Sequence, residues 1–497
     1  MSKQRNYILV YINGERKEIR GQQAFLNLAE YLRSELQLTG TKIVCAEGDC
    51  GACTVLVAAV KSESNEFEYR PINACIALMH SLDCSHIISI EGLNKIHPNK
   101  LHPIQQSMLE CHGSQCGFCT PGFVVAAAGM LEKTVNLNEK RVRNHLTGNL
   151  CRCTGYQQII TGIGSTNTSD YKTVKAHYHK QSIHKELLTA AQIPVVISHG
   201  ENSFIAPVNI GNTINHLQDQ QNSSRPTQIF AAATDLGVQI NKAQLAQQNA
   251  LSLHLITELY KYTLTDQHSS IGARITLTEL RHLIKEKHPE FSHFLNIFAS
   301  PQIKNNATLV GNIANGSPIG DTLPFLMAMD ALIVIEGSKG IRKCNINNFY
   351  LGYRKMDLAA TEIITHVEIP HKPDNTQLKL YKVSQRRDLD ISCVSSAFKV
   401  QFDQDNNLVD IAIAFGGVAA TVCRLTAIED KLKGLSKEEF FNQDISNKIA
   451  TSISTSLSPM SDVRGSEGFR KTLLENLYRK FIHELKAEEK VGSADEI

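Results

Sequence analysis

Residues 45–53 of this chain read Cys-Ala-Glu-Gly-Asp-Cys-Gly-Ala-Cys. The cysteines at 45, 50 and 53 follow the spacing C-x4-C-x2-C, and a fourth, Cys75, lies well downstream. This three-plus-one spacing is the plant-type [2Fe–2S] pattern, in which soft thiolate ligands hold two bridged irons. Gly48 and Gly51 permit the positive φ angles that a tight loop needs to aim its N–H groups at cluster sulfurs. We therefore predict that Cys45, Cys50, Cys53 and Cys75 ligate one such cluster.

The residues around this loop predict a small α+β domain. Residues 8–20 alternate apolar and polar side chains around Asn13-Gly14, which favours a hairpin with a type I′ turn. Residues 24–36 carry apolar side chains at helical spacing, and residues 54–60 are apolar and strand-like. A hairpin, a helix and a returning strand are expected of a β-grasp, ferredoxin-like fold.

A second group of cysteines follows a different pattern. It comprises C-x2-C, a long insertion and then C-x-C, formed by Cys116, Cys119, Cys151 and Cys153. Thr120-Pro121 predicts the start of a buried helix, with Thr120 as the N-cap. Further helices are expected over residues 138–147 and 155–163. Two short cysteine pairs on helix ends can complete a second set of four thiolates.

Zinc is the alternative ligand for both groups, because structural zinc sites also use four thiolates. Zinc sites are usually built from two short cysteine pairs, which fits the second group better than the asymmetric first group. From spacing alone, zinc stays open, above all at the second group. If zinc occupies these sites, the chain would be a zinc-stapled binding protein without enzymatic activity.

Composition limits the other possibilities. The chain has 497 residues, 42% of them hydrophobic and 20% charged, and a formal net charge of +2, so no strong basic field for nucleic acid or membrane is expected. The N-terminus does not have the pattern of a secretory signal, and the longest apolar stretch, residues 123–131, is too short to span a bilayer. We expect a cytoplasmic protein whose 13 cysteines stay reduced, so that their clustering indicates metal binding.

Longer strings around these cysteines resemble a known family. Residues 45–53, Gly113–Gly122 (GSQCGFCTPG) and Gly148–Tyr156 (GNLCRCTGY) resemble the two cluster motifs of molybdenum hydroxylases of the xanthine dehydrogenase type, in the same order and at matching separation. The resemblance implies the iron–sulfur and flavin subunit of such an enzyme. It also implies that Gln115 lies near the molybdopterin, where the second cluster collects electrons.

Two later segments resemble the flavin domain of that family. Ile229–Leu236 (IFAAATDL) aligns with the family's FAD pyrophosphate loop, although Ala232 and Ala233 replace small glycine or asparagine positions. Thr308–Asp321 (TLVGNIANGSPIGD) is close to a second FAD string, with Val310 in place of a usual glycine. The resemblance implies that FAD contacts Ile229, Phe230, Ala231, Ala232, Ala233, Thr234, Asp235, Leu236, Phe298, Thr308, Asn312, Asp321 and Lys382. Arg386, Arg387 and Asp390 are further charges expected near the flavin edge.

The resulting prediction is an α+β multidomain chain. Its expected parts are a plant-type [2Fe–2S] ferredoxin-like domain, a helical [2Fe–2S] bundle domain, a linker, an α+β FAD-binding domain and an α+β C-terminal flavoprotein domain. Their predicted boundaries are 1–84, 85–165, 166–190, 191–372 and 373–490.

The resemblance implies an electron-transfer function in purine catabolism (hypoxanthine and xanthine to urate). Electrons would pass from molybdopterin on a separate large subunit through two [2Fe–2S] clusters to FAD and then to NAD, with an assembly of two small and two large chains. No residue of this chain is expected to be catalytic, because the redox centres are cofactors. A related hydroxylase for another heterocycle or an aldehyde, with an acceptor other than NAD, is the alternative.

Overall fold

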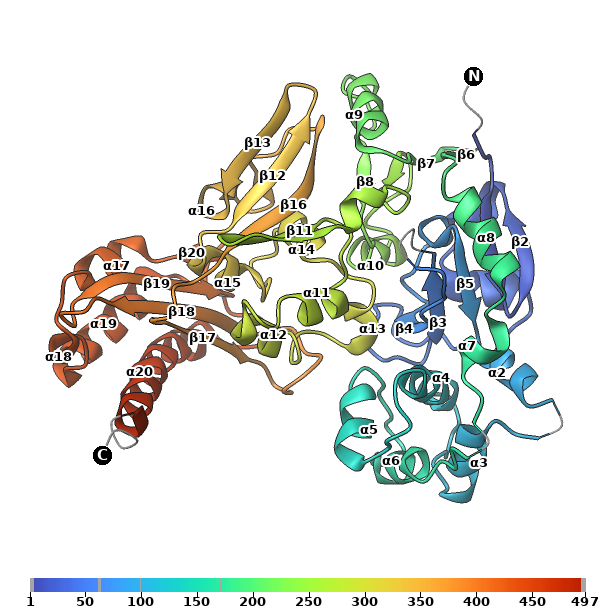
Figure 1. Cartoon of the computed structure of the whole chain (residues 1–497), viewed down its shortest axis with the longest axis horizontal. Helices are drawn as coiled ribbons and strands as arrows, with labels where there is room; N and C mark the ends of the chain where they lie inside the picture. The colour runs from blue at the N-terminus through green and yellow to red at the C-terminus, as the bar shows by residue number, and fades with distance from the viewer. Residues whose placement is uncertain (1–3, 61–63, 99, 170, 493–497) are drawn as a thin grey trace. The chain divides into compact units, whose positions relative to one another are not determined.

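The computed structural model describes residues 4–60, 64–98, 100–169 and 171–492 (Figure 1). They divide into two compact units. The first contains the residues up to Tyr260 together with Thr276–Thr278 and Ala299–Thr308, and the second contains Lys261–Ile275, Glu279–Phe298 and the residues from Leu309 onward. The expected α+β multidomain fold is confirmed, and each unit is described by itself below.

The first unit begins with a five-stranded sheet in the order β2-β1-β5-β3-β4. β1 and β5 are parallel and the other pairs are antiparallel. Asn13 and Gly14 have φ angles of 51° and 85°, so the predicted type I′ hairpin is confirmed. The strands are β1 (Ile8–Ile12), β2 (Glu15–Ile19), β3 (Thr54–Ala59), β4 (Arg70–Asn73) and β5 (Ser85–Ile88).

The helix expected over residues 24–36 is divided into three short pieces. They are a 3-10 turn η1 (Gly21–Phe25), a helix α1 (Leu28–Glu30) and a π-helical turn η2 (Tyr31–Glu35). The side chain of Asn27 accepts a hydrogen bond from the Glu30 N–H, so a new helix starts after Asn27. Periodicity indicated the buried face correctly but could not show this cap.

A group of helices follows the sheet, and it holds the second cysteine group. α4 is buried from Gly122 to Leu131, as its all-round apolar sequence predicted. The predicted N-cap was wrong: Cys119 occupies that position, and the Thr120 hydroxyl donates to Ser114 instead. A Cβ on Gly129 would crowd Leu56 and Pro71, so glycine lets α4 pack closely on β3 and β4. The helices are α2 (Ile90–Ile96), α3 (Pro103–Glu110), α4 (Thr120–Leu131), α5 (Glu139–His145) and α6 (Gln157–Gly164).

The segment predicted as a linker, residues 166–190, carries two helices in its described part. These are α7 (Val174–Tyr178) and α8 (Gln181–Ala190). The Tyr178 hydroxyl donates to the Gly92 carbonyl at 2.7 Å, so the segment packs on the domain that precedes it.

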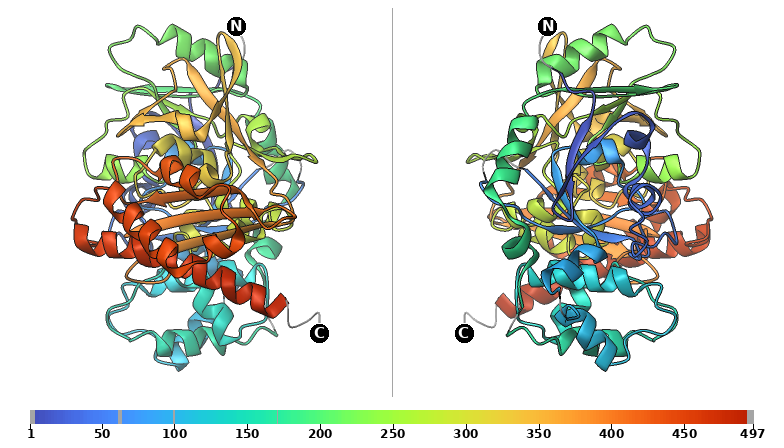
Figure 2. Two further views of the ribbon diagram at one scale, coloured as in Figure 1. Left: turned by 90° about the vertical axis from the view of Figure 1, so that its left-hand side faces the viewer. Right: turned by 90° about the vertical axis from the view of Figure 1, so that its right-hand side faces the viewer.

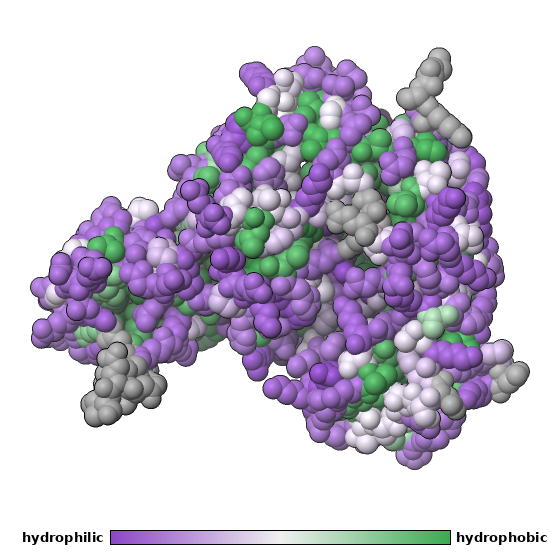
Figure 3. All heavy atoms as spheres, viewed as in Figure 1, coloured by the Kyte–Doolittle hydropathy of each residue, from purple (hydrophilic) through white to green (hydrophobic). Residues whose placement is uncertain are grey.

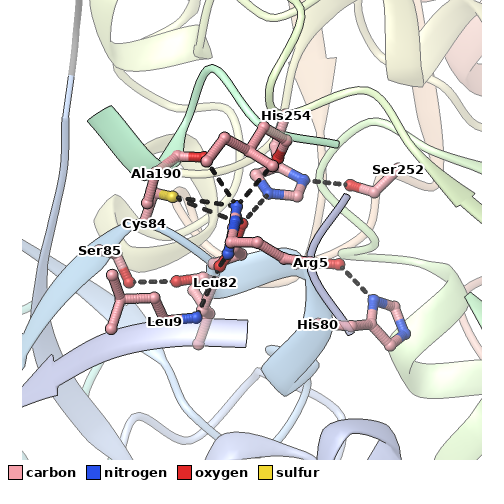
Figure 4. A network of polar contacts seen from close by, with 12 residues as sticks. Arg5, Leu9, His80, Leu82, Cys84, Ser85, Ala190, Ser252 and His254 are labelled. Atoms are coloured by element: carbon pink, nitrogen blue, oxygen red, sulfur yellow. Dashed lines mark hydrogen bonds and ion pairs between the residues drawn. The ribbon is translucent and has the colours of Figure 1, made fainter. Parts of the chain in front are cut away.

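A buried ion pair secures the end of α8, as Figure 4 shows. The Arg5 guanidinium donates to both carboxylate oxygens of Asp83, at 2.8 and 2.7 Å, and to the Ala190 carbonyl at 3.0 Å. His254 Nε2 lies 3.7 Å from the same carboxylate. Four segments that are distant in sequence, around residues 5, 83, 190 and 254, therefore meet at one buried charge pair. Removal of either charged partner would leave an uncompensated charge.

The rest of the first unit contains a four-stranded sheet in the order β6-β7-β9-β8. β7 and β8 both run parallel to β9. The elements are β6 (Val195–His199), β7 (Asn202–Ala206), α9 (Ile210–Asp219), β8 (Gln228–Phe230), α10 (Leu236–Asn241), β9 (Ala250–Ser252), η4 (Thr257–Tyr260) and α13 (Pro301–Lys304). Along the chain, α11 (Leu277–Leu283) crosses from the first unit to the second.

The second unit holds an antiparallel sheet in the order β10-β11-β16-β12-β13 and a small hairpin, β14-β15. Its strands are β10 (Tyr262–Leu264), β11 (His268–Gly272), β12 (Leu332–Gly337), β13 (Gly340–Asn345), β14 (Tyr350–Gly352), β15 (Lys355–Met356) and β16 (Glu362–Pro370). Its helices are α12 (Pro289–Phe294), α14 (Leu309–Asn315), α15 (Leu323–Ala328) and α16 (Ile346–Phe349).

A second antiparallel sheet, β17-β18-β19-β20, completes this unit, and helices α19 and α20 cross one of its faces (Figure 2). Alternation along β18 separates the two faces. Phe398 stacks on Phe481 of α20 at 4.8 Å, whereas its neighbour Ala397 clusters with Ala328 of α15. The elements are β17 (Thr376–Val383), β18 (Val394–Phe402), β19 (Leu408–Gly416), β20 (Cys423–Arg424), α17 (Thr426–Leu432), α18 (Lys437–Phe440), α19 (Gln443–Ser456) and α20 (Glu467–Gly492).

The face seen in Figure 3 is covered mostly by hydrophilic side chains, with apolar residues in small separate groups. Across the described helices, none combines the length and apolar character needed to cross a bilayer.

Candidate functional site

The first cysteine group is assembled by the loop before β3 and the turn after β4. Hydrogen bonds from the thiols of Cys50 and Cys75 lower the pKa of Cys45. A further hydrogen bond with Cys75 lowers the pKa of Cys53. All four predicted thiols are therefore joined through their sulfur atoms. Cys53 and Cys75 are each only 1% exposed, so half of the group lies inside the domain.

The backbone of this loop is shaped around the sulfurs. The Glu47 N–H donates to Cys45 Sγ at 3.4 Å. Gly48 and Gly51 have φ angles of 80° and 69°, as expected for glycines that turn the chain tightly. The Asn241 side chain, from the end of α10, donates to the carbonyls of Ala46 and Cys75 at 2.8 Å each and so ties both parts of the group together.

The second cysteine group lies at the start of α4 and in the loop between α5 and α6, and it is more open than the first. Cys153 Sγ is 3.6 Å from Cys116 Sγ, and both of these residues are exposed. Burial raises the pKa of Cys119 to about 12, and a hydrogen bond with Cys151 adds to this increase. The structure thus forms two sulfur pairs from the four predicted residues.

The two groups meet through the backbone. The Leu150 N–H, one residue before Cys151, donates to the Cys50 carbonyl at 2.9 Å. A Cβ on Gly51 would overlap the Gly148 carbonyl, so glycine is required for this close approach. Predicted ligand residues of the two groups are therefore separated by one hydrogen bond and a short run of covalent bonds.

The donor sets fit iron–sulfur clusters. Each group supplies four cysteines, all with free thiols. Within the described residues, no three His, Cys, Asp or Glu side chains are grouped so as to hold a single metal ion. A binuclear cluster makes a different demand, because its four thiolates are divided between two irons.

The predicted pyrophosphate loop, Ile229–Leu236, runs from β8 to the start of α10 in the first unit. Within the described part of the chain, the N–H groups of Ala232, Ala233 and Thr234 donate to no protein acceptor. Successive unpaired N–H groups in such a turn suit an anionic phosphate. The loop is held by a hydrogen bond from Asn306 to the Ala232 carbonyl at 3.1 Å.

Ala233 occupies a left-handed conformation, with φ 59°. This conformation costs a residue with a Cβ about 1–2 kcal/mol, whereas glycine adopts it freely. The replacement noted in the sequence thus has a structural consequence at position 233. The N–H groups remain available, so the loop can still present donors to a phosphate.

The second predicted flavin segment forms α14 and the turns after it. In the second unit, the Lys382 ammonium donates to Asp321 Oδ2 at 2.6 Å and to the Asp390 carbonyl at 2.8 Å. Asp321 Oδ1 is buried without a hydrogen-bond partner among the described residues, which leaves an acceptor for a ligand hydroxyl. Asn312 Oδ1 accepts from the Thr322 hydroxyl at 2.6 Å.

The remaining predicted flavin residues are distributed over both units. Thr308 is buried in the first unit, and Phe298 is half-buried in the second. Val310, which replaces a glycine, is buried in α14. Among the predicted positions, Asp321 and Lys382 are joined by a direct contact within one unit.

Other charged or polar residues singled out in the sequence are accessible. Arg386 pairs with Asp390 at 2.5 Å; burial alone would raise the pKa of Asp390, but these hydrogen bonds lower it. Gln115 is exposed beside the second cysteine group. The sequence analysis missed Asn149, Asn241 and Gln302. Asn149 lies within the motif Gly148–Tyr156, which could have drawn attention to it. No sequence pattern indicated a role for Asn241 or Gln302.

Comparison with protein families accounts for most of the chain. Residues 10–80 match the 2Fe-2S iron-sulfur cluster binding domain, and residues 89–164 match the [2Fe-2S] binding domain. Residues 200–372 match the FAD binding domain in molybdopterin dehydrogenase, and residues 379–485 match the CO dehydrogenase flavoprotein C-terminal domain. The chain carries the iron–sulfur and flavin domains of the molybdenum hydroxylases.

Curated relatives of these molybdenum hydroxylase domains include xanthine dehydrogenases. Xanthine dehydrogenase 1 of Arabidopsis thaliana is 31% identical over 95% of this chain and 39% of its own length. The xanthine dehydrogenase of Oryza sativa is 30% identical over 86% of this chain and 36% of its own length. The chain thus spans less than half of the length of these relatives.

Solved structures of similar fold include a carbon monoxide dehydrogenase chain from Hydrogenophaga pseudoflava. It is 22% identical with a TM-score of 0.52, covering 56% of this chain and 96% of that chain. A chain of quinoline 2-oxidoreductase from Pseudomonas putida 86 is also 22% identical, with a TM-score of 0.50, covering 56% and 94%. At these identities the likeness concerns the fold alone.

Proposed function

We propose that this chain is the electron-transfer part of a xanthine dehydrogenase-like molybdenum hydroxylase. In this proposal it passes electrons from a molybdopterin centre, through two [2Fe–2S] clusters, to FAD and then to NAD, in the oxidation of hypoxanthine and xanthine. The similarity to plant xanthine dehydrogenases over most of the chain supports this choice of substrate.

The observation that carries the proposal is the junction between the two cysteine groups. Each group holds four thiols, and the hydrogen bond from Leu150 N–H to the Cys50 carbonyl links them directly. Such a link suits a chain that transfers electrons between two clusters better than a chain that only binds another molecule. The open second group offers a surface at which electrons can enter, and the buried first group lies further along the route.

The protein's own residues would hold and tune the redox groups. Two thiolate sets would bind the clusters, which supply one-electron transfer, and FAD would supply the two-electron step to NAD. Backbone N–H groups of Ile229–Leu236 would bind the FAD pyrophosphate, and Asp321, held by Lys382, would accept a flavin hydroxyl. The N–H donated to Cys45 Sγ would stabilise a thiolate and raise the reduction potential of its cluster.

We also propose a partner. The curated relatives are more than twice the length of this chain, and their remaining length leaves room for further domains. In the proposal, a separate large subunit supplies the molybdopterin-binding part, in an assembly of two small and two large chains. Exposed Gln115, next to Cys116, would face that centre.

The first test is the purified full chain, produced under conditions that support cluster assembly. We expect flavin and iron–sulfur absorbance in the visible range, with iron and FAD measured chemically, and NADH–dye activity without xanthine turnover. A colourless chain that contains zinc would support the zinc-stapled alternative and refute the proposal. Xanthine turnover by the chain alone would refute the division between two subunits.

The second test concerns substrate and acceptor. The complex purified with its partner should be assayed with a panel of purines, other heterocycles and aldehydes, each against NAD, a quinone and oxygen. Xanthine with NAD should give the highest kcat/KM. Preference for an aldehyde, or for an acceptor other than NAD, would replace xanthine dehydrogenase by another member of the family.

A further inference from the structure

Gln302 in α13 lies at the junction between the two cysteine groups. Its side chain is 1% exposed. Its amide nitrogen donates to Asn149 Oδ1 at 2.8 Å and to the Thr54 hydroxyl at 3.3 Å. Thr54 follows Cys53, and Asn149 lies two residues before Cys151. One buried amide therefore contacts the loop of each cysteine group.

Asn149 carries this contact into the junction itself. Its side-chain amide donates to the Gly51 carbonyl at 3.0 Å, and that carbonyl also accepts from the Thr54 hydroxyl at 2.6 Å. The hydrogen bond from Leu150 to Cys50 is formed by the residues next to these two. Asn149 is thus hydrogen-bonded to the first cysteine loop directly beside the bond from Leu150 to Cys50.

Gly148 shows how closely Gln302 fits. A Cβ on Gly148 would overlap Gln302 Oε1 and would lie 2.8 Å from both Gln302 Cδ and Ser300 Cβ. The backbone conformation at Gly148 does not itself require glycine, because its φ is not positive. Glycine is therefore needed at this position for space, and the side chain of Gln302 takes up much of that space.

We propose that Gln302 is a positioning residue for electron transfer between the two clusters. Acting through Asn149 and Thr54, it fixes the relative position of the two cysteine loops and thereby the hydrogen bond from Leu150 to Cys50. This inference rests on the proposed function, because it assumes that both cysteine groups hold clusters. A shorter or apolar side chain would leave the Asn149 oxygen buried without its donor.

The main test compares Gln302→Met with wild type in the full chain. Methionine has nearly the same length but no N–H donor. Iron and FAD content should stay at the wild-type level, while the spin–spin splitting between the two reduced clusters, measured by low-temperature EPR, should change or disappear. An unchanged splitting in Gln302→Met would overturn the inference.

Asn305→Ala is the matched control. Asn305 follows the same helix and donates to the Pro71 carbonyl at 2.9 Å, so its loss weakens the attachment of α13 without a contact at the junction. We expect Asn305→Ala to keep the wild-type splitting. If it altered the splitting as much as Gln302→Met, general loosening of α13 would replace the specific role of Gln302.

Gln302→Glu provides a second variant if the methionine variant fails to assemble. A protonated carboxyl can donate to Asn149, but an ionised one cannot. Burial raises the pKa of a carboxyl, so the protonated form persists to a higher pH than in water before it ionises. The splitting should therefore be close to wild type at low pH and be lost at higher pH, whereas wild type stays constant. A pH-independent splitting equal to that of wild type would contradict the proposal.

Gly148→Ala approaches the same contact from the other side. The new methyl group should displace the Gln302 amide and reproduce the EPR change of Gln302→Met, and the double variant should add little to either change. Fully additive effects would overturn the inference. If wild type itself contained no clusters, the proposed function would fail instead, so the two failures are distinguishable.

Discussion

The two cysteine groups present the same four thiols in opposite surroundings. In the first group, Cys53 and Cys75 are 1% exposed, and a side chain from α10 donates to the backbone beside the sulfurs. In the second group, Cys116 and Cys153 are exposed in the loops that precede α4 and α6. Cysteine spacing predicts four thiolates in each group, whereas the access of water is set by what packs around each loop.

This difference has consequences for both stability and potential. A cluster shielded from water loses solvent stabilisation of its charge, and its potential depends more on nearby N–H groups. A cluster at the surface can accept electrons from outside the chain. We therefore expect substitutions in the first group to affect both folding and redox behaviour, and matched substitutions in the second group to affect mainly redox behaviour.

Gly51→Ala should have the largest effect, because it acts at the place where the buried loop and the exposed loop touch and should therefore disturb both groups. Its φ of 69° costs alanine about 1–2 kcal/mol, and the methyl group would also overlap the Gly148 carbonyl. We expect a loss of about 3 kcal/mol in the free energy of unfolding. Urea unfolding and EPR should show both clusters perturbed. Perturbation of the first cluster alone would mean that the two loops are mechanically independent.

Cys53→Ala tests the buried group. The variant should lose the first cluster and keep the second, so that about half of the iron remains. Because the site is 1% exposed, the iron-free protein should also lose about 1–3 kcal/mol of stability. Iron analysis and urea unfolding of iron-depleted protein measure the two effects. Full iron content would show that Cys53 is not a ligand.

Low pH should lower the folding stability of both parts of the chain that hold the cysteine groups, because each part contains a buried histidine. Burial lowers the pKa of His80, in the ferredoxin-like domain, to about 3 and that of His102, at the start of α3, to about 4. In the unfolded chain both groups bind protons below about pH 6.5. Stability should therefore be fully present above that pH and fall by about 1.4 kcal/mol per pH unit for each histidine as the pH decreases towards its folded value.

The measurement is urea unfolding between pH 7 and pH 5. His102→Gln should reduce the slope of stability against pH by the contribution of one proton. His80→Gln should do the same for the ferredoxin-like domain. A slope that neither variant changes would show that these side chains are already accessible to protons in the native state.

Cys153→Ala should have the smallest effect on folding. The variant should lose the second cluster, yet the stability of the iron-free protein should change by less than about 0.5 kcal/mol, because the side chain is exposed. Comparison with Cys53→Ala under identical conditions provides the control. Equal destabilisation by the two variants would refute the distinction drawn between the buried and exposed groups.

Local sequence signals predicted the elements that depend on neighbouring residues. Asn13-Gly14 indicated the hairpin turn, and the all-round apolar run after Pro121 indicated a buried helix. The helix expected over residues 24–36 was divided, because the Asn27 cap is a specific hydrogen bond that periodicity does not reveal. Thr120 was predicted as an N-cap, but its hydroxyl bonds to Ser114, which only the folded loop brings close.

The sequence by itself determined the four-cysteine pattern of each group, from which thiolate ligands are predicted. The spacing of the cysteines is a local property of short loops. The glycines within these loops indicate where the backbone needs positive φ angles, as at Gly48 and Gly51. Only the tertiary structure decided which cysteines are buried, that Leu150 bonds to Cys50, and that Gln302 lies between their loops. Gln302 lies more than 150 residues after Asn149 in the chain. A contact between such distant residues is made by tertiary packing, so no local sequence pattern predicts it.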